Sequence, residues 1–207
     1  MNIIYLSSCC TDNKFNDLFQ KGYTKKLPQA QKYHLLLIEG LATCIDGKLT
    51  AISALPINRQ WTKKLVFTRE VEHYGNMQFI YNAFINLKGL RQFNLQRGTK
   101  KDIRRICKDN SECVIICDVL NYSLSKAALS YGNKNNIPVI GIVTDVPGFQ
   151  AGARLKTQSF FNRLIAKYVS KLKTKALKSF DAFLFLTEQM NDVVNKNNKP
   201  YIVMEGH

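Results

Sequence analysis

Three carboxylates, each at the end of an apolar run, are the residues of this sequence best placed to do chemistry. Asp118 closes the run 113–118, Asp145 closes the run 137–145, and Glu188 follows the run 182–187. Continuous apolar runs are typical of strands buried in a parallel sheet, and ligands meet such a sheet at the carboxyl ends of its strands. A carboxylate at that edge accepts a hydrogen bond from a substrate hydroxyl or acts as a general base. We therefore expect the three carboxylates to lie along one cleft.

Helix capping is the alternative role for these carboxylates, because Asp, Ser and Thr also stand where a strand turns into a helix. Capping is favoured for Glu188, and for Asp118 both roles stay open. Asp145 begins the sequence Asp-Val-Pro-Gly, which is typical of a turn and not of a helix start. Capping is therefore a weaker explanation for Asp145.

A basic amphipathic helix is expected between residues 158 and 180. Its apolar residues recur at helical spacing; they are Phe161, Leu164, Ile165, Tyr168, Val169, Leu172 and Ala176. Its other faces carry basic residues, namely Arg163, Lys167, Lys171, Lys173, Lys175 and Lys178. Such a helix suits an anionic membrane surface, where each basic residue contributes roughly 1 kcal/mol. Docking of the apolar stripe on the sheet is the alternative, and both hold if the basic face points toward lipid.

The charge of the chain favours an anionic partner. A net charge of +15, from 30 Lys and Arg against 15 Asp and Glu, fits a phospholipid surface, a phosphorylated substrate or nucleic acid, with a solvated basic surface as the alternative. The amino terminus lacks the basic start and the long apolar run of a signal peptide. No uninterrupted apolar segment approaches the ~20 residues of a membrane-spanning helix. A membrane contact would therefore be peripheral.

Several kinds of site have no motif in the sequence. The glycine fingerprint of a dinucleotide site, the phosphate-binding P-loop and the nucleophile elbow are all missing. The three histidines and six cysteines show no metal-ligand spacing, and His34 lies in an expected helix where a structural role is favoured. The cysteines favour a reducing, cytosolic compartment, with Cys113 and Cys117 as buried apolar residues.

The order of expected elements predicts one α/β domain over residues 1–207. Strands are expected over 3–8, 49–56, 65–68 and 77–85, and helices over 29–44 and 87–108, with a polar loop over 9–22. The three apolar runs and a last strand from residue 201 follow. Alternating strands and helices predict a mostly parallel sheet with helices on both faces.

Four segments of the second half resemble, in this order, the amino-terminal half of bacterial GT-B glycosyltransferases of the family-4-like group. They are VIICDVLNYSLSKAAL, NNIPVIGIVTDVPGF, FDAFLFLTEQMNDVVN and KPYIVMEGH, and SALPINRQ and YNAFINLKGLRQ in the first half fit the same group. The resemblance covers nearly the whole chain. It implies a Rossmann-like domain that binds the acceptor, while a second domain, absent here, binds the nucleotide-sugar donor.

The sequence departs from this group in two places. Many relatives carry a glycine-rich loop after the first strand, where this chain has Ser7-Ser-Cys-Cys-Thr-Asp12. Many also have His-Asp where this chain has Thr144-Asp145, so that only Asp145 carries over. The resemblance implies that Asp145 contacts the acceptor or the transferred sugar. It also implies further substrate-binding residues along the same edge, namely Asp118, Asn121, Tyr122, Thr144, Thr187, Glu188 and Glu205.

The sequence thus predicts the acceptor-side half of a metal-independent glycosyltransferase. The expected donor is a nucleotide-sugar, with no other cofactor, and the acceptor is a membrane-associated glycolipid or a polysaccharide. Expected partners are a donor-binding domain or chain and the anionic inner face of the cell membrane, with a cytoplasmic location. Two alternatives stay open: a non-catalytic membrane-surface subunit of a split glycosyltransferase, and a charge-driven nucleic-acid-binding protein.

Overall fold

The computed structural model describes residues 1–25, 29–108, 112–145, 171–172 and 174–204. Its centre is an eight-stranded sheet with the strand order β10-β9-β8-β7-β1-β2-β5-β4. The strands are β1 (Asn2–Ser7), β2 (Leu49–Ser53), β4 (Glu70–Tyr74), β5 (Met77–Tyr81), β7 (Cys113–Asp118), β8 (Val139–Val143), β9 (Ala182–Phe185) and β10 (Tyr201–Val203). Every neighbouring pair is parallel except β4 and β5. The mostly parallel α/β fold predicted from the sequence is confirmed.

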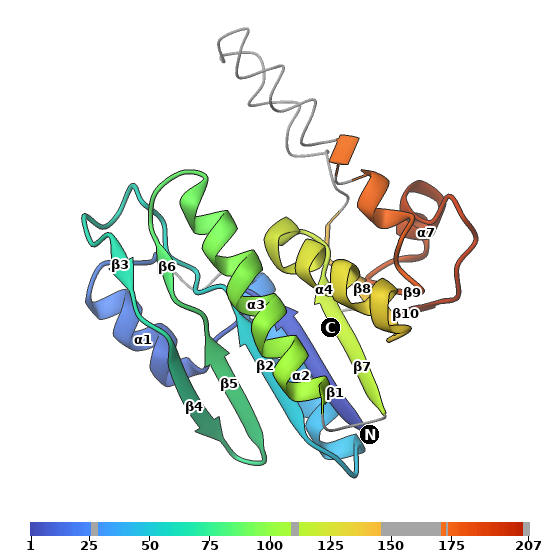
Figure 1. Cartoon of the computed structure of the whole chain (residues 1–207), viewed down its shortest axis with the longest axis horizontal. Helices are drawn as coiled ribbons and strands as arrows, with labels where there is room; N and C mark the ends of the chain where they lie inside the picture. The colour runs from blue at the N-terminus through green and yellow to red at the C-terminus, as the bar shows by residue number, and fades with distance from the viewer. Residues whose placement is uncertain (26–28, 109–111, 146–170, 173, 205–207) are drawn as a thin grey trace, which may run out of the picture.

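Helices cover both faces of this sheet. They are α1 (Asp12–Gln20), α2 (Gln29–Cys44), α3 (Leu90–Lys108), α4 (Tyr122–Asn135) and α7 (Glu188–Val194). Figure 1 shows α3 and α4 packed side by side on the near face of the sheet and α2 on the far face. These helices lie on connections between parallel strands: α1 and α2 join β1 to β2, α3 lies between β5 and β7, and α4 joins β7 to β8.

The core is centred on β1, the strand with neighbours on both sides in the middle of the sheet. Ile4, Tyr5 and Leu6 are fully buried, and the register pairs them with Thr50–Ile52 of β2 and Ile115–Cys117 of β7. Strands buried on both faces need side chains that are apolar on both faces, which is why these runs do not alternate. The carboxyl ends of β1, β2, β7, β8 and β9 consequently share one edge.

A small antiparallel ribbon stands beside the main sheet. It pairs β3 (Val66–Phe67) with β6 (Phe84–Ile85), and the rings of Phe67 and Phe84 stack at 4.9 Å between centroids. In Figure 1 the ribbon lies near the first turns of α3.

Two sequence expectations about the elements were wrong. The expected loop over 9–22 contains α1, which Thr11 caps by accepting a hydrogen bond from the Lys14 backbone amide at 3.2 Å. Cys113 is buried as expected, but it is joined to Cys107 in a disulfide that ties the end of α3 to the start of β7, so it is not a free thiol. Because disulfides are more typical of oxidising compartments, the cytoplasmic location stays a prediction.

Candidate functional site at the carboxyl edge of the sheet

The structure places the sequence-selected residues along the carboxyl edge of neighbouring parallel strands. Asp118 is the last residue of β7, Thr144 and Asp145 follow β8, and Thr187 and Glu188 follow β9. These three strands are adjacent in the sheet. Glu205 lies outside the described residues. The edge is therefore a row of polar side chains at the carboxyl ends of adjacent strands, where α/β sheets bind their ligands.

Asp118 is buried and holds the turn that leads from β7 into α4. Its Oδ1 accepts a hydrogen bond from the Leu120 backbone amide at 2.9 Å, which is the side-chain turn that Asp favours. The capping position of α4 belongs to Asn121 and not to Asp118. The carboxylate therefore shapes the turn with one oxygen and directs the other toward α2.

The second oxygen of Asp118 faces a buried histidine. His34 of α2 has its Nε2 atom 3.7 Å from Asp118 Oδ2, and its Nδ1 atom 2.7 Å from the hydroxyl of Tyr5 in β1. We name Tyr5, His34 and Asp118 the polar triad. Its members come from β1, α2 and β7, and all three are buried. A group of this kind is expensive to bury unless its atoms are paired.

The protonation state of His34 follows from its burial and its partners. Removal from water lowers the pKa of His34 to about 4, so the ring is neutral at pH 7. The Tyr5 hydroxyl stays protonated, because burial raises the pKa of Tyr5 well above its ordinary value. The neutral ring has two tautomers: in one, Nδ1 accepts from Tyr5 and the ring proton on Nε2 faces Asp118; in the other, Nδ1 donates to Tyr5. This Nε2 atom has no hydrogen-bond partner among the described residues.

Asn121 and Tyr122 are half-buried at the start of α4, beside Asp118. The side chain of Asn121 makes no capping hydrogen bond. The Ser125 hydroxyl instead donates to the carbonyl oxygens of Asn121 at 2.9 Å and Asp118 at 3.1 Å. This contact fixes the backbone of the turn between β7 and α4.

Thr144 and Asp145 are half-buried at the end of β8, at the same edge as Asp118. Cys117 and Asp118 of β7 pair with Gly141 and Ile142 of β8, so the two strands end side by side. The position is open enough for a ligand and close enough to the core for a defined geometry.

Glu188 is exposed at the first turn of α7, and the Tyr201 hydroxyl donates to its Oε1 at 2.5 Å. That contact raises the pKa of Tyr201. Thr187 occupies the capping position of α7 without a side-chain capping bond. Glu188 is therefore not the capping residue. It lies in the first turn of α7, where its negative charge interacts favourably with the helix dipole.

The loop that follows β1 is filled by its own side chains. Cys9, Cys10 and Thr11 are buried, and the Gln31 amide of α2 donates to the Cys10 carbonyl oxygen at 2.9 Å. On the other side, the Thr11 hydroxyl donates to Glu72 of β4 at 2.9 Å. Burial raises the pKa of Cys10 to about 12, so this thiol is protonated at pH 7. The loop is thus a packed, anchored element at the centre of the edge.

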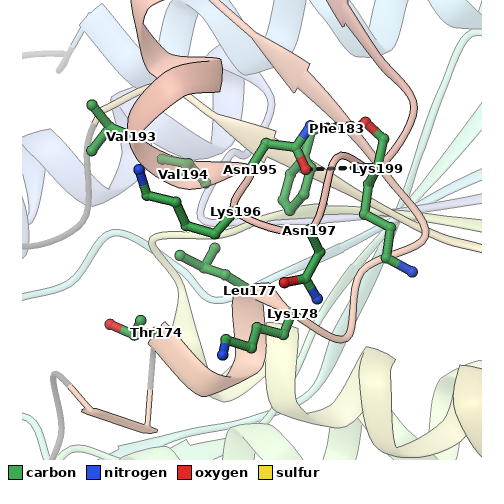
Figure 2. A pocket seen from close by; sticks show the side chains of 10 residues that line it. All are labelled: Thr174, Leu177, Lys178, Phe183, Val193, Val194, Asn195, Lys196, Asn197 and Lys199. Carbon is green, nitrogen blue, oxygen red and sulfur yellow. Dashed lines mark hydrogen bonds between the residues drawn. The ribbon is translucent and has the colours of Figure 1, made fainter.

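Three of the predicted lipid-facing residues are described, and all are exposed: Lys171, Lys175 and Lys178. Arg163, Lys167 and Lys173 lie outside the described residues. Lys178 also lines a cavity of about 160 Å³ between residues 174–178 and α7. Figure 2 shows the ammonium groups of Lys178, Lys196 and Lys199 pointing in different directions. Because these cations do not converge, the cavity is a weaker ligand site than the carboxyl edge.

Two further surveys cover the described part of the chain. No group of three or more His, Cys, Asp or Glu side chains there could hold a metal ion. No helix within it has the length and apolarity needed to cross a bilayer.

The sequence singled out Asp118 but did not show that His34 lies beside it or that Tyr5 bonds His34. Tyr5 lies inside an apolar run, and His34 was assigned a structural role. The available signal was the spacing of Gln31 and His34, which lie three residues apart on one face of α2 and both point inward.

Comparison with known proteins identifies the fold. No protein-family model and no curated protein sequence matches the chain. Among solved structures, a sucrose-phosphate synthase from Thermosynechococcus elongatus matches with a TM-score of 0.60 and 11% identity, covering 99% of this chain and 48% of that one.

Two other structures have lower scores. A UGT transferase from Siraitia grosvenorii, in complex with UDP, covers 98% of this chain and 50% of its own, with 10% identity and a TM-score of 0.48. A trehalose-phosphate synthase from Burkholderia xenovorans, in complex with glucose-6-phosphate, covers 93% and 42%, with 12% identity and a TM-score of 0.49. This chain thus spans about half the length of each structure. It has the Rossmann-like α/β fold of the sucrose-phosphate synthase.

Proposed function

We propose that this chain is the acceptor-binding, amino-terminal half of a GT-B glycosyltransferase of the family-4-like group. In the complete enzyme, a nucleotide-sugar bound by the second half donates its sugar to an acceptor held at the carboxyl edge described above. The reaction uses no metal ion. Asp145 contacts the acceptor or the transferred sugar, and acts as the general base if the acceptor hydroxyl needs one.

The observation that carries the proposal is the position of the polar edge in the fold. The residues selected from the sequence lie at the carboxyl ends of adjacent parallel strands, where α/β sheets bind ligands. The fold that holds them is shared with a sucrose-phosphate synthase. Asp118, Asn121 and Tyr122 line the acceptor side, while Thr144, Thr187, Glu188 and Glu205 complete the edge.

An apolar groove supports the presence of a companion half. It has a volume of about 320 Å³ and runs from α2 across β8, β9 and β10. Ile202 in this groove is 63% exposed, although it belongs to a sheet strand. An apolar sheet face is stable in water only when another element packs on it. The donor-binding half, on the same polypeptide or on a partner chain, supplies that cover.

The membrane-associated acceptor is supported by the exposed lysines of residues 171–178. Lys171, Lys175 and Lys178 present three positive charges within two helical turns, with no acidic residue between them. We propose that they face the anionic inner surface of the cell membrane, where each contributes roughly 1 kcal/mol to binding.

A non-catalytic role in a split enzyme is the second candidate. In that case the chain holds the acceptor and the membrane, and a partner chain binds the donor.

Sugar transfer by the chain with and without its donor-binding half tests the proposal. A panel of radiolabelled nucleotide-sugars is incubated with a bacterial membrane-lipid extract, and label transferred to lipid or glycan is counted. We expect residues 1–207 alone to transfer nothing, and the complete enzyme to transfer label from one donor. Transfer by residues 1–207 alone, or no transfer from any donor by the complete enzyme, would contradict the proposal.

A further inference from the structure

The outer face of the β3–β6 ribbon is apolar although it is open to water. Val66 and Ile85 are direct cross-strand partners, and their side chains are 59% and 36% exposed. The opposite face of the ribbon already buries the stacked pair Phe67 and Phe84. A two-stranded ribbon with one face on the core normally presents polar side chains on the other. The sequence of this ribbon is apolar on both faces.

The apolar surface continues onto the segments joined to the ribbon. Leu65 and Leu87 flank the two strands, and the backbone N–H of Asn86 donates to the Leu65 carbonyl oxygen at 2.6 Å. Leu90 and Phe93 follow in the first turn of α3, with Phe93 57% exposed. We name Leu65, Val66, Ile85, Leu87, Leu90 and Phe93 the ribbon patch. Exposed apolar residues gathered in this way mark an interaction surface.

The segments that form the ribbon patch carry charges of a single sign, and Glu70 and Asp102 follow directly beyond them. Residues 54–69 and 82–101, which contain the whole patch, hold nine basic residues and no acidic one. Lys63, Lys64 and Lys88 are exposed beside the patch. Arg91 does not add to this exposed charge, because its guanidinium donates to the carbonyl oxygen of Leu55 at 2.8 Å and lies over the Phe84 ring. Lys63 and Lys88 therefore lie exposed beside partly exposed apolar side chains, while the Lys64 ammonium lies over the Phe67 ring, 5.1 Å from its centroid.

The only tryptophan of the protein lies in the loop that leads into the ribbon. Trp61 precedes Leu65 by four residues and is 38% exposed, with the Lys25 ammonium 5.4 Å from its ring centroid. A partly exposed Trp next to lysines is typical of residues that sit at the boundary between lipid and water.

We propose that the ribbon patch inserts into the interfacial region of an anionic phospholipid bilayer. Apolar side chains that enter the headgroup boundary, within a rim of lysines that pair with lipid phosphates, are the chemistry of interfacial binding. A docking surface for a protein needs no such one-sided charge. The surface is separate from residues 171–178 in the sequence. It rests on the membrane-associated part of the proposed function and is independent of the transfer reaction.

Fluorescence of Trp61 tests the proposal without any mutation. The protein is mixed with vesicles of equal parts phosphatidylcholine and phosphatidylglycerol, and with vesicles of phosphatidylcholine alone. We expect a blue shift of the Trp61 emission with the anionic vesicles, and quenching when their lipids carry brominated chains. Binding to anionic vesicles with unchanged Trp61 emission would overturn the proposal, and so would the absence of binding.

Substitutions in the ribbon patch then locate the contact. The double variant Val66→Thr with Ile85→Thr keeps β-branched side chains but removes apolar surface. We expect its binding to anionic vesicles to fall about tenfold or more, because the apolar contact is lost. Leu36→Gln in α2 is the control, since Leu36 is also exposed and α2 lies on the far face of the sheet in Figure 1.

Circular dichroism confirms that both variants are folded before binding is compared. Wild-type binding by the ribbon variant would overturn the proposal. The ribbon patch would then be a docking site for an acidic protein, or residues 171–178 alone would contact the bilayer. If the complete protein binds vesicles but transfers no sugar, the proposed transferase function is contradicted and the proposed membrane contact is not.

Discussion

The polar triad and the ribbon patch break the same rule of protein architecture in opposite directions. At the centre of the sheet, Tyr5, His34 and Asp118 place polar groups where the core should be apolar. At the ribbon, Val66 and Ile85 place apolar groups where the surface should be polar. Single departures are common, but each of these regions collects several.

The difference between the two regions lies in what holds the exception in place. The polar triad comes from three elements and is fixed by hydrogen bonds inside the fold. Both the cost of burying these polar groups and the gain from pairing them therefore enter the free energy of folding. The ribbon patch contributes little to stability, because its side chains stay in water. Its benefit must come from a surface outside this chain. Changes in the triad should therefore alter folding, and changes in the patch should alter binding.

The pH dependence of stability gives the largest expected effect on the triad side. Burial lowers the pKa of His34 from 6.5 to about 4. Between pH 6.5 and about pH 4, His34 is therefore protonated in the unfolded chain and neutral in the folded chain. Stability therefore falls as the pH drops from about 6.5 to about 4, by about 3 kcal/mol for His34 alone. Urea unfolding at pH 7 and at pH 4 measures the loss. His34→Gln, which retains a polar side chain, should remove most of the loss, and an equal loss in this variant would assign it to other groups.

Removal of the Asp118 carboxylate should give the next largest effect. Asp118→Ala deletes the acceptor of the Leu120 amide and the group that faces His34, at a cost of about 2 kcal/mol. Asp118→Asn is the matched variant, because it keeps Oδ1 as an acceptor, and it should cost below about 1 kcal/mol. Chemical denaturation of both variants measures the difference. Equal costs would mean that the turn is held by other contacts.

The smallest effect on folding is expected in the ribbon patch. Val66→Thr with Ile85→Thr should change the free energy of unfolding by less than about 1 kcal/mol, since Val66 is 59% and Ile85 36% exposed. Thermal unfolding monitored by circular dichroism checks this value. A large destabilisation would show that the ribbon patch packs within the fold, and the contrast with the polar triad would disappear.

Much of the fold could be predicted from the sequence because buried parallel strands form continuous apolar runs. The apolar runs that became β1, β7, β8 and β9 are continuous, and their polar ends gave the position of the edge. Helix α1 was missed because only Phe15 and Leu18 of its nine residues are buried, which leaves almost no apolar period. Strand β4 was missed because an edge strand with the sequence Glu-Val-Glu-His-Tyr is mostly exposed.

The candidate site could be predicted in position but not in its contacts. A strand end identifies Asp118 as an edge residue, but nothing in the local sequence says that His34 approaches it from α2 or that Tyr5 orients His34. Such contacts depend on how helices dock on the sheet, which is decided by the whole core. The ribbon patch was missed for a related reason, since pairing of β3 with β6 brings Val66 opposite Ile85 from distant positions.

Sugar transfer by an Asp145→Ala variant of the complete enzyme tests the central claim most directly. The account predicts that transfer falls at least about a hundredfold, because Asp145 lies at the end of β8 on the edge that holds the acceptor. Circular dichroism should be unchanged, and Asp17→Ala, an exposed change on α1 that breaks only the ion pair with Lys21, should transfer at the wild-type rate. Wild-type turnover by Asp145→Ala would remove Asp145 from the mechanism and contradict the placement of the acceptor at this edge.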